Sequence, residues 1–474
     1  MKKHVFYTYI SVLCMILTAF VAVLPIQSQS NLASITIDVT QMRFIDHTEL
    51  DETAYFTFSL TVNDEKVKIA TWDTVPYVLQ PGITETITLP EDATEATVMM
   101  QLSVTDTSGT NPCDLTGSTS SATYAVITYD LNTGHWTGDD YLADPSGYGR
   151  LNGCDDGSIY NNEYDCELWF SITQDDPDGD DIPTWMEEEI YGTDPLINNK
   201  GEDTDNDEVP IEWEWKWGYD PLVAEEHNTL DVDGDSLTNV EEYLVSNFDS
   251  DPFRKDIYLE LDWMDLGPNG EKSEFPALSK QLLKNPFHRR NYVFHVDTGI
   301  LGGGEIFPFD ESIDSTELLQ IYEDYFIHND EFAWKRGIFH YGIYVYDCVP
   351  KGYAFSGDVD PHWGYHPGTN GFMISSNRME RNGRLFGPTV EYFYGSATMH
   401  EMGHNFGFRY GEPFGVDAQL GKYPWHPMYY VYRNYKSIMN YRYTYKIFDY
   451  SNGTHGILDN DDWGTIDLTY FEND

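Results

Sequence analysis

The chain has 474 residues, of which 80 are Asp or Glu and 27 are Lys or Arg, so its formal net charge is −53. A field this negative repels nucleic-acid phosphates and anionic membrane surfaces, and we expect neither as a partner. The length allows several domains, and 41% hydrophobic with 15% aromatic residues argues against wholesale disorder.

The first 30 residues have the pattern of an export signal. Lys2-Lys3 gives a basic start, an apolar run covers 12–24, and residues 28–30 form a small-x-small cleavage pattern. We predict a signal peptide over 1–30. The alternative is an uncleaved N-terminal anchor, since 5–24 is almost long enough to span a bilayer. The protein is therefore expected to be secreted, or attached to the cell surface by this segment alone.

Cysteine usage agrees with export. Beyond residue 30 the chain contains Cys113, Cys154, Cys166 and Cys348. An even number of cysteines permits disulfides in an exported chain. Three of the four lie between residues 113 and 166, so we expect one bridge in that region.

Residues 31–172 have the pattern of a β-domain. The segments 35–39, 54–62 and 96–104 alternate or run apolar, and polar or Gly/Pro-containing turns separate them. This spacing predicts an all-β sandwich, which we interpret as an accessory domain.

Residues 173–252 are far more acidic, with 26 acids against Lys200 and Lys216. One pattern occurs three times, and each copy has acids at positions 1, 3, 5 and 12 and an apolar residue at position 7. The twelve acids are Asp176, Asp178, Asp180 and Glu187; Asp203, Asp205, Asp207 and Glu214; and Asp231, Asp233, Asp235 and Glu242.

This spacing has a chemical reason. Ca²⁺ takes six to eight oxygen ligands, which a tight loop presents from alternate positions, and a glutamate at position 12 closes the cage from the start of a helix. The copies resemble thrombospondin type 3 and related calcium loop-helix repeats, and we predict three structural Ca²⁺ sites. One departure is position 6, usually Gly, where Asp181, Glu208 and Ser236 stand.

Residues 253–474 have an α/β pattern, with strands expected at 256–262, 292–296, 337–346 and 371–375. The decisive segment is 395–411, GSATMHEMGHNFGFRYG. Residues four apart on a helix share a face, so His400 and His404 can direct two imidazoles at one Zn²⁺. Glu401 can then act as general base on a zinc-activated water and return the proton to the leaving amine.

Two further signals follow this helix. Gly407 can end it and turn the chain back, and residues 437–441 read SIMNY. Together these motifs resemble the metzincin metallopeptidases, whose motif is HExxHxxGxxH and whose methionine turn lies beneath the zinc. The resemblance covers roughly 253–474. It implies that Met439 is the structural methionine and that Tyr441 is the tyrosine that approaches the zinc in astacin-like and serralysin-like members.

The family pattern places a third histidine at position 410, where this chain has Tyr410. A catalytic zinc usually has three protein ligands. We predict Tyr410 as the third ligand, bound as phenolate. Tyr441 is an alternative, as are Glu412, Asp417 and His426, which lie within reach along the chain.

The sequence thus predicts an exported, zinc-dependent metalloendopeptidase acting on a protein or peptide substrate. It would contain a β-sandwich, a calcium-stabilised repeat spacer and a metzincin-like α/β domain. The alternative is a calcium-dependent surface or adhesion protein with an inactive peptidase domain, which the residue at position 410 motivates.

Overall fold

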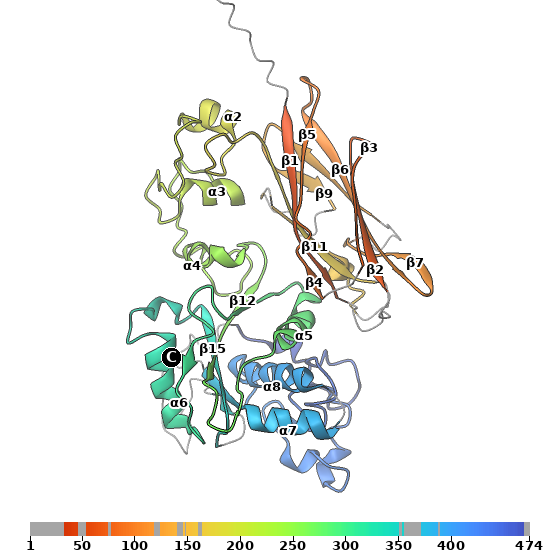
Figure 1. Cartoon of the computed structure of the whole chain (residues 1–474), viewed down its shortest axis with the longest axis vertical. Helices are drawn as coiled ribbons and strands as arrows, with labels where there is room; N and C mark the ends of the chain where they lie inside the picture. The colour runs from red at the N-terminus through yellow and green to blue at the C-terminus, as the bar shows by residue number, and fades with distance from the viewer. Residues whose placement is uncertain are drawn as a thin grey trace, which may run out of the picture.

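The structure is a computed structural model that describes residues 33–45, 54–73, 77–117, 124–139, 146, 148–159, 164–349, 353–354, 371–386 and 389–468. A β-sandwich lies at one end of the long axis, an α/β domain at the other, and the acidic segment runs along one side between them (Figure 1). The predicted signal segment 1–30 lies outside the described residues. Within those residues, no helix has the length and apolar character needed to cross a membrane.

Two antiparallel sheets form the N-terminal domain. The first has the order β10 (Tyr148–Asn152), β11 (Cys166–Thr173), β1 (Ser34–Phe44) and β4 (Val78–Leu79), with β5 (Ile83–Thr88) also paired to β1. The second has the order β3 (Glu65–Trp72), β2 (Tyr55–Val62), β6 (Glu95–Asp106), β8 (Ala125–Asp130) and β9 (Trp136–Gly138), with β7 (Gly109–Pro112) paired to β6. The 3-10 helix η2 (Gly153–Asp156) follows β10.

Alternation along the strands builds one core between these sheets. Ile35 and Ile37 of β1 point inward and pack with Val98 and Met100 of β6, and all four are fully buried. Polar residues of the same strands face outward. The predicted β-sandwich is confirmed.

The expected disulfide is wrong. No bridge joins any two of the four described cysteines, all of which are buried. Cys154 directs its Sγ at the Asp165 carboxylate, with 3.4 Å between Sγ and Oδ2. In the region where we expected a bridge, the Cys154 thiol therefore contacts a carboxylate.

The acidic segment contains three short helical units: α2 (Thr184–Met186) continuing into the π-helical turn η3 (Glu187–Tyr191), α3 (Ile211–Trp217), and α4 (Asn239–Leu244) followed by η4 (Ser246–Phe248). Each unit follows one acidic loop. The position-7 residues Ile182, Val209 and Leu237 are buried, and the first two lie in small cores between successive units. Position 7 therefore has the packing role that its apolar character predicts.

The C-terminal domain is built on a mixed sheet. The strand order is β13 (Val293–Asp297), β12 (Asp256–Met264), β15 (Phe339–Val345), β17 (Gly371–Ser375) and β16 (Tyr353–Ala354), with β14 (Ile306–Phe307) paired to β12. All pairings are parallel except β16 with β17. The four strands expected in this region are confirmed.

Helices cover both faces of this sheet (Figure 1). One core contains residues of α5 (Ala277–His288), α7 (Ser376–Phe386) and α8 (Val390–Asn405), and a second lies against α6 (Ser315–Ile321) and the turn η5 (Tyr322–Phe326). The remaining 3-10 turns are η6 (Ala333–Lys335), η7 (Gln419–Gly421), η8 (Pro427–Tyr429) and η9 (Trp463–Thr465). The domain is α/β, as expected.

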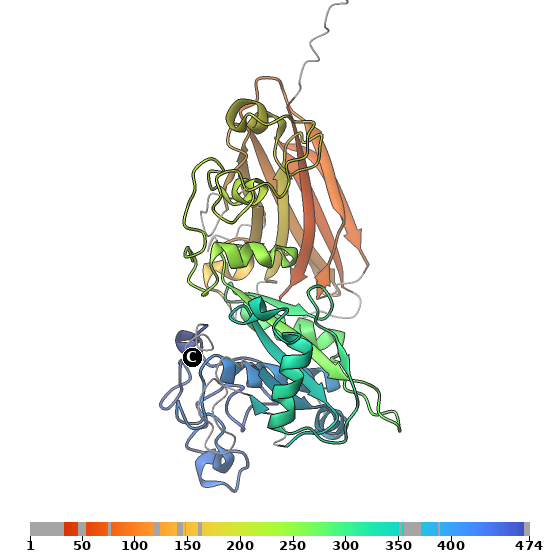
Figure 2. The ribbon, with the colours of Figure 1, turned by 90° about the vertical axis from the view of Figure 1, so that its left-hand side faces the viewer.

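The β-sandwich is docked on the α/β domain through α5, and Figure 2 shows the two in direct succession along the long axis. Arg43 donates to the side chains of Asn285 and Gln281, each at 2.7 Å. Glu167 on β11 accepts from Arg150 and lies 2.8 Å from Nδ1 of His288 on α5. These buried polar contacts hold the sandwich in one orientation.

Candidate functional site

The His-Glu-x-x-His motif lies in the last turns of α8, which spans Val390–Asn405. The Thr389 side chain caps this helix by accepting a hydrogen bond from the Tyr392 N–H. His400 and His404 lie one turn apart, with ring centroids 5.2 Å apart. The four-residue spacing therefore places both imidazoles on one face, as predicted.

Backbone carbonyls orient both rings. Nδ1 of His400 lies 3.0 Å from the Ile438 oxygen, and Nδ1 of His404 lies 2.5 Å from the Phe408 oxygen. Because a carbonyl only accepts, each Nδ1 carries a proton and a neutral ring presents its lone pair at Nε2. The Nε2 atoms lie 3.0 and 3.2 Å from Oδ1 and Oδ2 of Asp417. The three ligand atoms all lie within 4.8 Å of one another, so the group can hold a metal ion.

Asp417 reaches the site because the methionine turn holds its backbone. Its N–H donates to the Met439 carbonyl at 3.0 Å, and its φ of 54° is uncommon for a residue with a side chain. Asp417 stands 13 residues after His404. It was one of several alternatives in the sequence, and neither Glu412 nor His426 belongs to the converging group.

Tyr410, the predicted third ligand, lies at the surface of the protein. The Arg409 N–H donates to the Glu412 carbonyl and the Glu412 N–H to the Arg409 carbonyl, both at 2.9 Å. This tight reversal carries Tyr410 at its tip, and the Tyr410 side chain is 71% exposed. In the structure Asp417 contacts both rings, and the assignment of Tyr410 as a ligand stays a prediction.

The Asp417 carboxylate dominates the electrostatics of the two rings. Burial lowers the pKa of His404, but Asp417 raises it to about 9. Burial raises the pKa of Asp417, but the two rings bring it far below its usual range. The Nε2 atoms and the carboxylate thus favour a positive charge between them, either protons or a metal ion.

This donor set fits zinc. Two imidazoles held through Nδ1 by carbonyls, with one carboxylate, make the three protein ligands that leave a fourth position open. Asp417 Oδ1 is buried and has no hydrogen-bond partner of good geometry among the described residues. A buried carboxylate oxygen of this kind is suited to a cation.

Glu401 lies beside the donors, in the wall of a cleft of about 310 Å³. Burial raises the pKa of Glu401, and the two histidines oppose that shift. A carboxylate whose pKa is raised toward neutrality is a better proton acceptor. Arg378 and Lys422 line the same cleft, which brings two positive charges into a strongly acidic protein.

Met439 and Tyr441 flank the site as the resemblance implies. A Cβ on Gly403 would lie 2.3 Å from Sδ of Met439, so the turn approaches α8 where only glycine fits. The Tyr441 ring lies 5.6 Å from the His400 ring, with an interplanar angle of 22°. Burial, then nearby carboxylates, raises the pKa of Tyr441 well above its usual value. Its hydroxyl therefore stays protonated and can donate.

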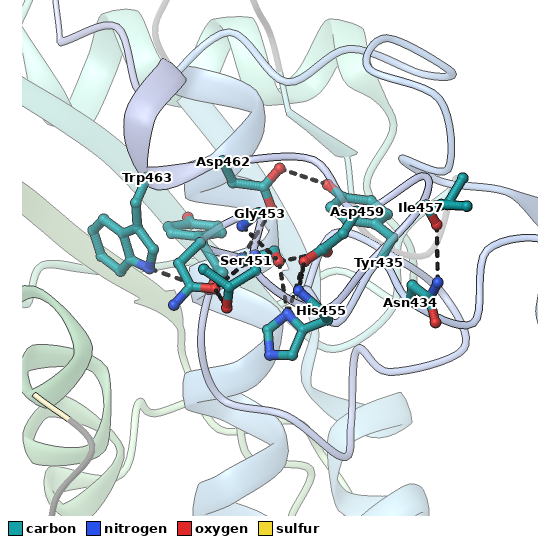
Figure 3. A network of polar contacts seen from close by, with 12 residues as sticks. Asn434, Tyr435, Ser451, Gly453, His455, Ile457, Asp459, Asp462 and Trp463 are labelled. Carbon is teal, nitrogen blue, oxygen red and sulfur yellow. Dashed lines mark hydrogen bonds and ion pairs between the residues drawn. The ribbon is translucent and has the colours of Figure 1, made fainter.

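A polar network anchors the methionine turn, residues 437–441, to the segment that follows (Figure 3). The Tyr435 hydroxyl donates to Asp462 at 2.9 Å, and Asp462 also accepts from the Ser451 N–H at 3.2 Å. Asn440 donates through Nδ2 to the Tyr435 carbonyl at 2.8 Å. These contacts position the turn on which Asp417 depends.

The same network contains Ser451, His455 and Asp459, which superficially resemble a catalytic triad (Figure 3). The Ser451 hydroxyl donates directly to Asp459 at 2.7 Å. The His455 ring contacts both residues through Nδ1 alone, and the His455 backbone N–H donates to Asp459. A triad needs the two ring nitrogens on different partners, so that histidine can deprotonate serine. This group is structural.

The three acidic loops share one backbone arrangement. In each, the acid at position 1 accepts the N–H groups of positions 4 and 6, at 2.7–3.2 Å. The position-6 residues Asp181, Glu208 and Ser236 have φ of 73°, 84° and 83°. The sharp turn expected of glycine is therefore made by residues with side chains, at some conformational cost.

Each loop contains buried carboxylate oxygens that have no hydrogen-bond partner in the described part of the chain. Glu187, Glu214 and Glu242, at position 12, are at most 2% exposed, and each has at least one oxygen without a hydrogen bond. The position-3 acids Asp178, Asp205 and Asp233 also have orphaned oxygens. The acids at positions 1, 3 and 5 of every loop form a group that can hold a metal ion.

Mutual repulsion is strong in these loops. Burial, then neighbouring acids, raises the pKa of Glu214 to about 9 and that of Asp233 to about 9. Carboxylates crowded in this way favour a bound cation.

The position-5 acid fastens each loop to the segment that follows. Asp180 accepts the Asn199 N–H at 3.1 Å, and Asp207 accepts that of Glu225 at 3.0 Å. The third loop makes the corresponding bond, at 2.7 Å, with Asp256, the first residue of β12. The last acidic loop is thus fixed directly to the sheet of the α/β domain.

No protein-family model and no curated protein sequence matches this chain. Among solved structures, human GIVD cytosolic phospholipase A2, in complex with methyl γ-linolenyl fluorophosphonate and terbium chloride, matches over 30% of this chain and 17% of its own, with 10% identity and a TM-score of 0.18. A C2 domain of plant extended synaptotagmin 1 matches over 30% of this chain and 96% of its own, with 7% identity and a TM-score of 0.19. At these scores the likeness carries no argument.

Proposed function

We propose that residues 253–474 form a zinc-dependent endopeptidase and that His400, His404 and Asp417 hold the ion. The observation that carries this proposal is the convergence of the three donors beside Glu401, which lines a cleft together with His400. The resemblance of the helix motif and the methionine turn to the metzincins supports peptide-bond hydrolysis as the reaction.

When bound, zinc supplies a Lewis acid that activates water and polarises the scissile carbonyl. Glu401 takes the proton released by the attacking water and delivers it to the leaving amine. Tyr441 donates its hydroxyl hydrogen to the oxygen on which negative charge develops. The Ile438 and Phe408 carbonyls hold the imidazoles in orientation throughout.

The alternative of an inactive domain rested on the missing third histidine. Asp417 supplies a third donor from another segment, which favours the enzyme. In keeping with the export signal expected over residues 1–30, we propose that the protein acts outside the cytoplasm, on a protein or peptide substrate.

We also propose that the first and third acidic loops bind Ca²⁺. Their ligand atoms are carboxylate oxygens, the hard donors that Ca²⁺ prefers. The buried oxygens of Glu187 and Glu242 that have no hydrogen bonds support this assignment. The second loop differs because a buried histidine, His227, lies beside its acids.

The test of the peptidase is Glu401→Gln in the full chain. Glutamine keeps the shape of the side chain but cannot accept the proton, so we expect cleavage of a protein substrate to fall about 10²–10⁴-fold. Because Glu401 is not a ligand in this assignment, zinc content measured by mass spectrometry should not change.

Glu391→Gln, on the first turn of the same helix, is a matched control because it makes the same change away from the cleft. Full activity in Glu401→Gln would refute the assigned base. Loss of zinc together with activity would make Glu401 a ligand instead.

A further inference from the structure

The second acidic loop contains a buried histidine. His227 is fully buried. Its Nε2 lies 3.3 Å from Oδ2 of Asp207, 3.6 Å from Oε2 of Glu225 and 4.0 Å from Oε1 of Glu214. Among the described residues, this Nε2 has no hydrogen-bond partner, and neither has either carboxylate oxygen of the buried Glu214. The imidazole nitrogen thus converges with the buried carboxylates of Asp207 and Glu214, and the partly exposed Glu225 lies at the edge of this group.

The shortest of these separations, 3.3 Å between His227 Nε2 and Asp207 Oδ2, matches the distance between two ligand atoms of one coordination shell. Ligands at about 2.0–2.1 Å from a tetrahedral ion lie roughly 3.3–3.4 Å from each other. Asp207, Glu214 and His227 each offer one ligand atom, and these atoms all lie within 4.8 Å of one another. Buried carboxylates without partners carry a large desolvation cost, which a cation at the centre of this group would offset.

The surroundings of His227 hold the ring in place. Its Nδ1 lies 2.8 Å from the amide of Asn239, which is 1% exposed. The Tyr219 ring stands edge-on at 4.8 Å and the Trp213 ring at 5.8 Å. Since the oxygen and nitrogen of an amide exchange places by a half-turn, Asn239 can accept the Nδ1 proton. The Nε2 lone pair then faces the carboxylates, as in a ligating histidine.

The other two loops have no counterpart of this histidine. His227 stands two residues after Glu225, whose N–H bonds to the position-5 acid. The same step from Asn199 and Asp256, the corresponding residues of the other loops, leads to Gly201 and Tyr258. The Tyr258 hydroxyl contacts Ser250 instead, at 2.9 Å. At this position, therefore, only the second loop has an imidazole; near the third loop, His295 of β13 contacts the Asp256 carboxylate at 2.6 Å but belongs to no metal-type group among the described residues.

We propose that this second loop binds a divalent first-row transition-metal ion of the Zn²⁺ or Mn²⁺ class, through Asp207, Glu214 and His227. Calcium sites are built from oxygen, whereas imidazole with carboxylates suits borderline ions. This ion lies between two calcium-type loops and is distinct from the one at α8. It crosslinks α3, which carries Glu214, to the segment that leads into the third loop.

The experiment counts metals in the full chain carrying His404→Ala. This background removes a ligand from the α8 site, so failure of the peptidase proposal does not affect the result. The chain is stripped with a chelator, equilibrated with excess Ca²⁺ and limiting Zn²⁺, gel-filtered and analysed by mass spectrometry. We expect about one zinc and two calcium ions per chain.

Adding His227→Ala should remove that zinc, whereas adding His455→Ala, a matched loss of a histidine elsewhere, should leave it. Three calcium ions with no zinc in the His404→Ala chain would overturn the proposal, as would zinc retained after His227→Ala.

If the His227→Ala chain does not fold, a second measurement tests the same assignment without that substitution. X-ray absorption of the zinc-loaded His404→Ala chain should show nitrogen and oxygen neighbours at about 2.0–2.2 Å. A shell of oxygen alone would overturn the assignment of His227.

Discussion

The α8 site and the acidic loops both gather carboxylates away from water, but they do so in different ways. In the loops, the acids at positions 1 to 12 come from one short segment, and the position-1 acid shapes the turn by accepting two N–H groups of its own loop. At α8, the proposed ligands come from the helix and from Asp417, and the backbones of Ile438, Phe408 and Met439 orient them. One site is local, and the other exists only when distant segments are packed together.

This difference predicts which substitutions will disturb each site. A loop that carries its own ligands needs little from the rest of the fold, so removing one acid should affect mainly that loop. The α8 site depends on the methionine turn, which the network around Tyr435 and Asp462 anchors in turn. Substitutions remote in sequence should therefore affect α8 more than the loops.

Removal of Asp417 is expected to have the largest effect. In Asp417→Ala the two imidazoles lose their carboxylate partner, and zinc would keep only two protein ligands. We expect zinc affinity to fall by more than the roughly 10–100-fold that loss of a hydrogen bond to a ligand costs, and peptidase activity to fall with it. Metal titration and a cleavage assay measure both.

Tyr410→Phe is the matched control, because it removes the hydroxyl that was predicted to bind zinc. With its side chain 71% exposed, its effect on stability should stay within about 0.5 kcal/mol, with zinc and activity unchanged. The opposite ranking of these two variants would restore Tyr410 as the ligand.

The features that the sequence can predict are those set by local patterns. His400, Glu401 and His404 follow from helical spacing, and the twelve loop acids from a repeated register, because both patterns are local. The strands of the sandwich and of the α/β domain follow from apolar alternation or apolar runs. In each case the chemistry lies within a few residues of the signal.

Asp417 could not be selected in this way. It lies in an irregular segment, and its position depends on a hydrogen bond to Met439 and a left-handed φ. His227 is similar, since it lies outside the position 1–12 pattern and reaches the second loop only through folding. The expected disulfide was wrong because even cysteine counts permit bridges without specifying geometry.

The hydrogen bond between Asp235 of the third loop and Asp256 of β12 tests whether a substitution in one loop affects only that loop. In Asp235→Ala the Asp256 N–H loses its acceptor at the first residue of the central strand. We expect a loss of about 1–3 kcal/mol, seen as faster hydrogen exchange in β12 and earlier thermal inactivation. Asp180→Ala makes the same change in the first loop, where the partner is Asn199 of the acidic segment, so β12 should exchange as before. Equal effects of both variants on β12 would show that the loops are not independent.

The last comparison concerns Glu167, a buried carboxylate balanced by protein charges. Burial opposes its ionisation, but Arg150, His288 and Arg43 bring its pKa to about 2, from 4.5. Burial lowers the pKa of His288 to about 3, from 6.5, against the attraction of Glu167. Both folded pKa values are depressed, so both contributions are complete above pH 6.5. The contribution of His288 to the free energy of unfolding is lost as pH falls from 6.5 toward 3. The contribution of Glu167, on the order of 3 kcal/mol, is lost as pH falls from 4.5 toward 2.

This contact between β-sandwich and α5 should therefore respond to acid and not to a chelator. With Ca²⁺ saturating, limited proteolysis between the two domains should increase below about pH 6.5, and His288→Gln should flatten the upper part of that dependence because glutamine does not titrate. Chelation at pH 7.5 should expose the acidic segment and leave the Glu167 contact closed. A chelator that separates the domains as effectively as acid would mean that the loops, and not the arginines around Glu167, hold the sandwich in place.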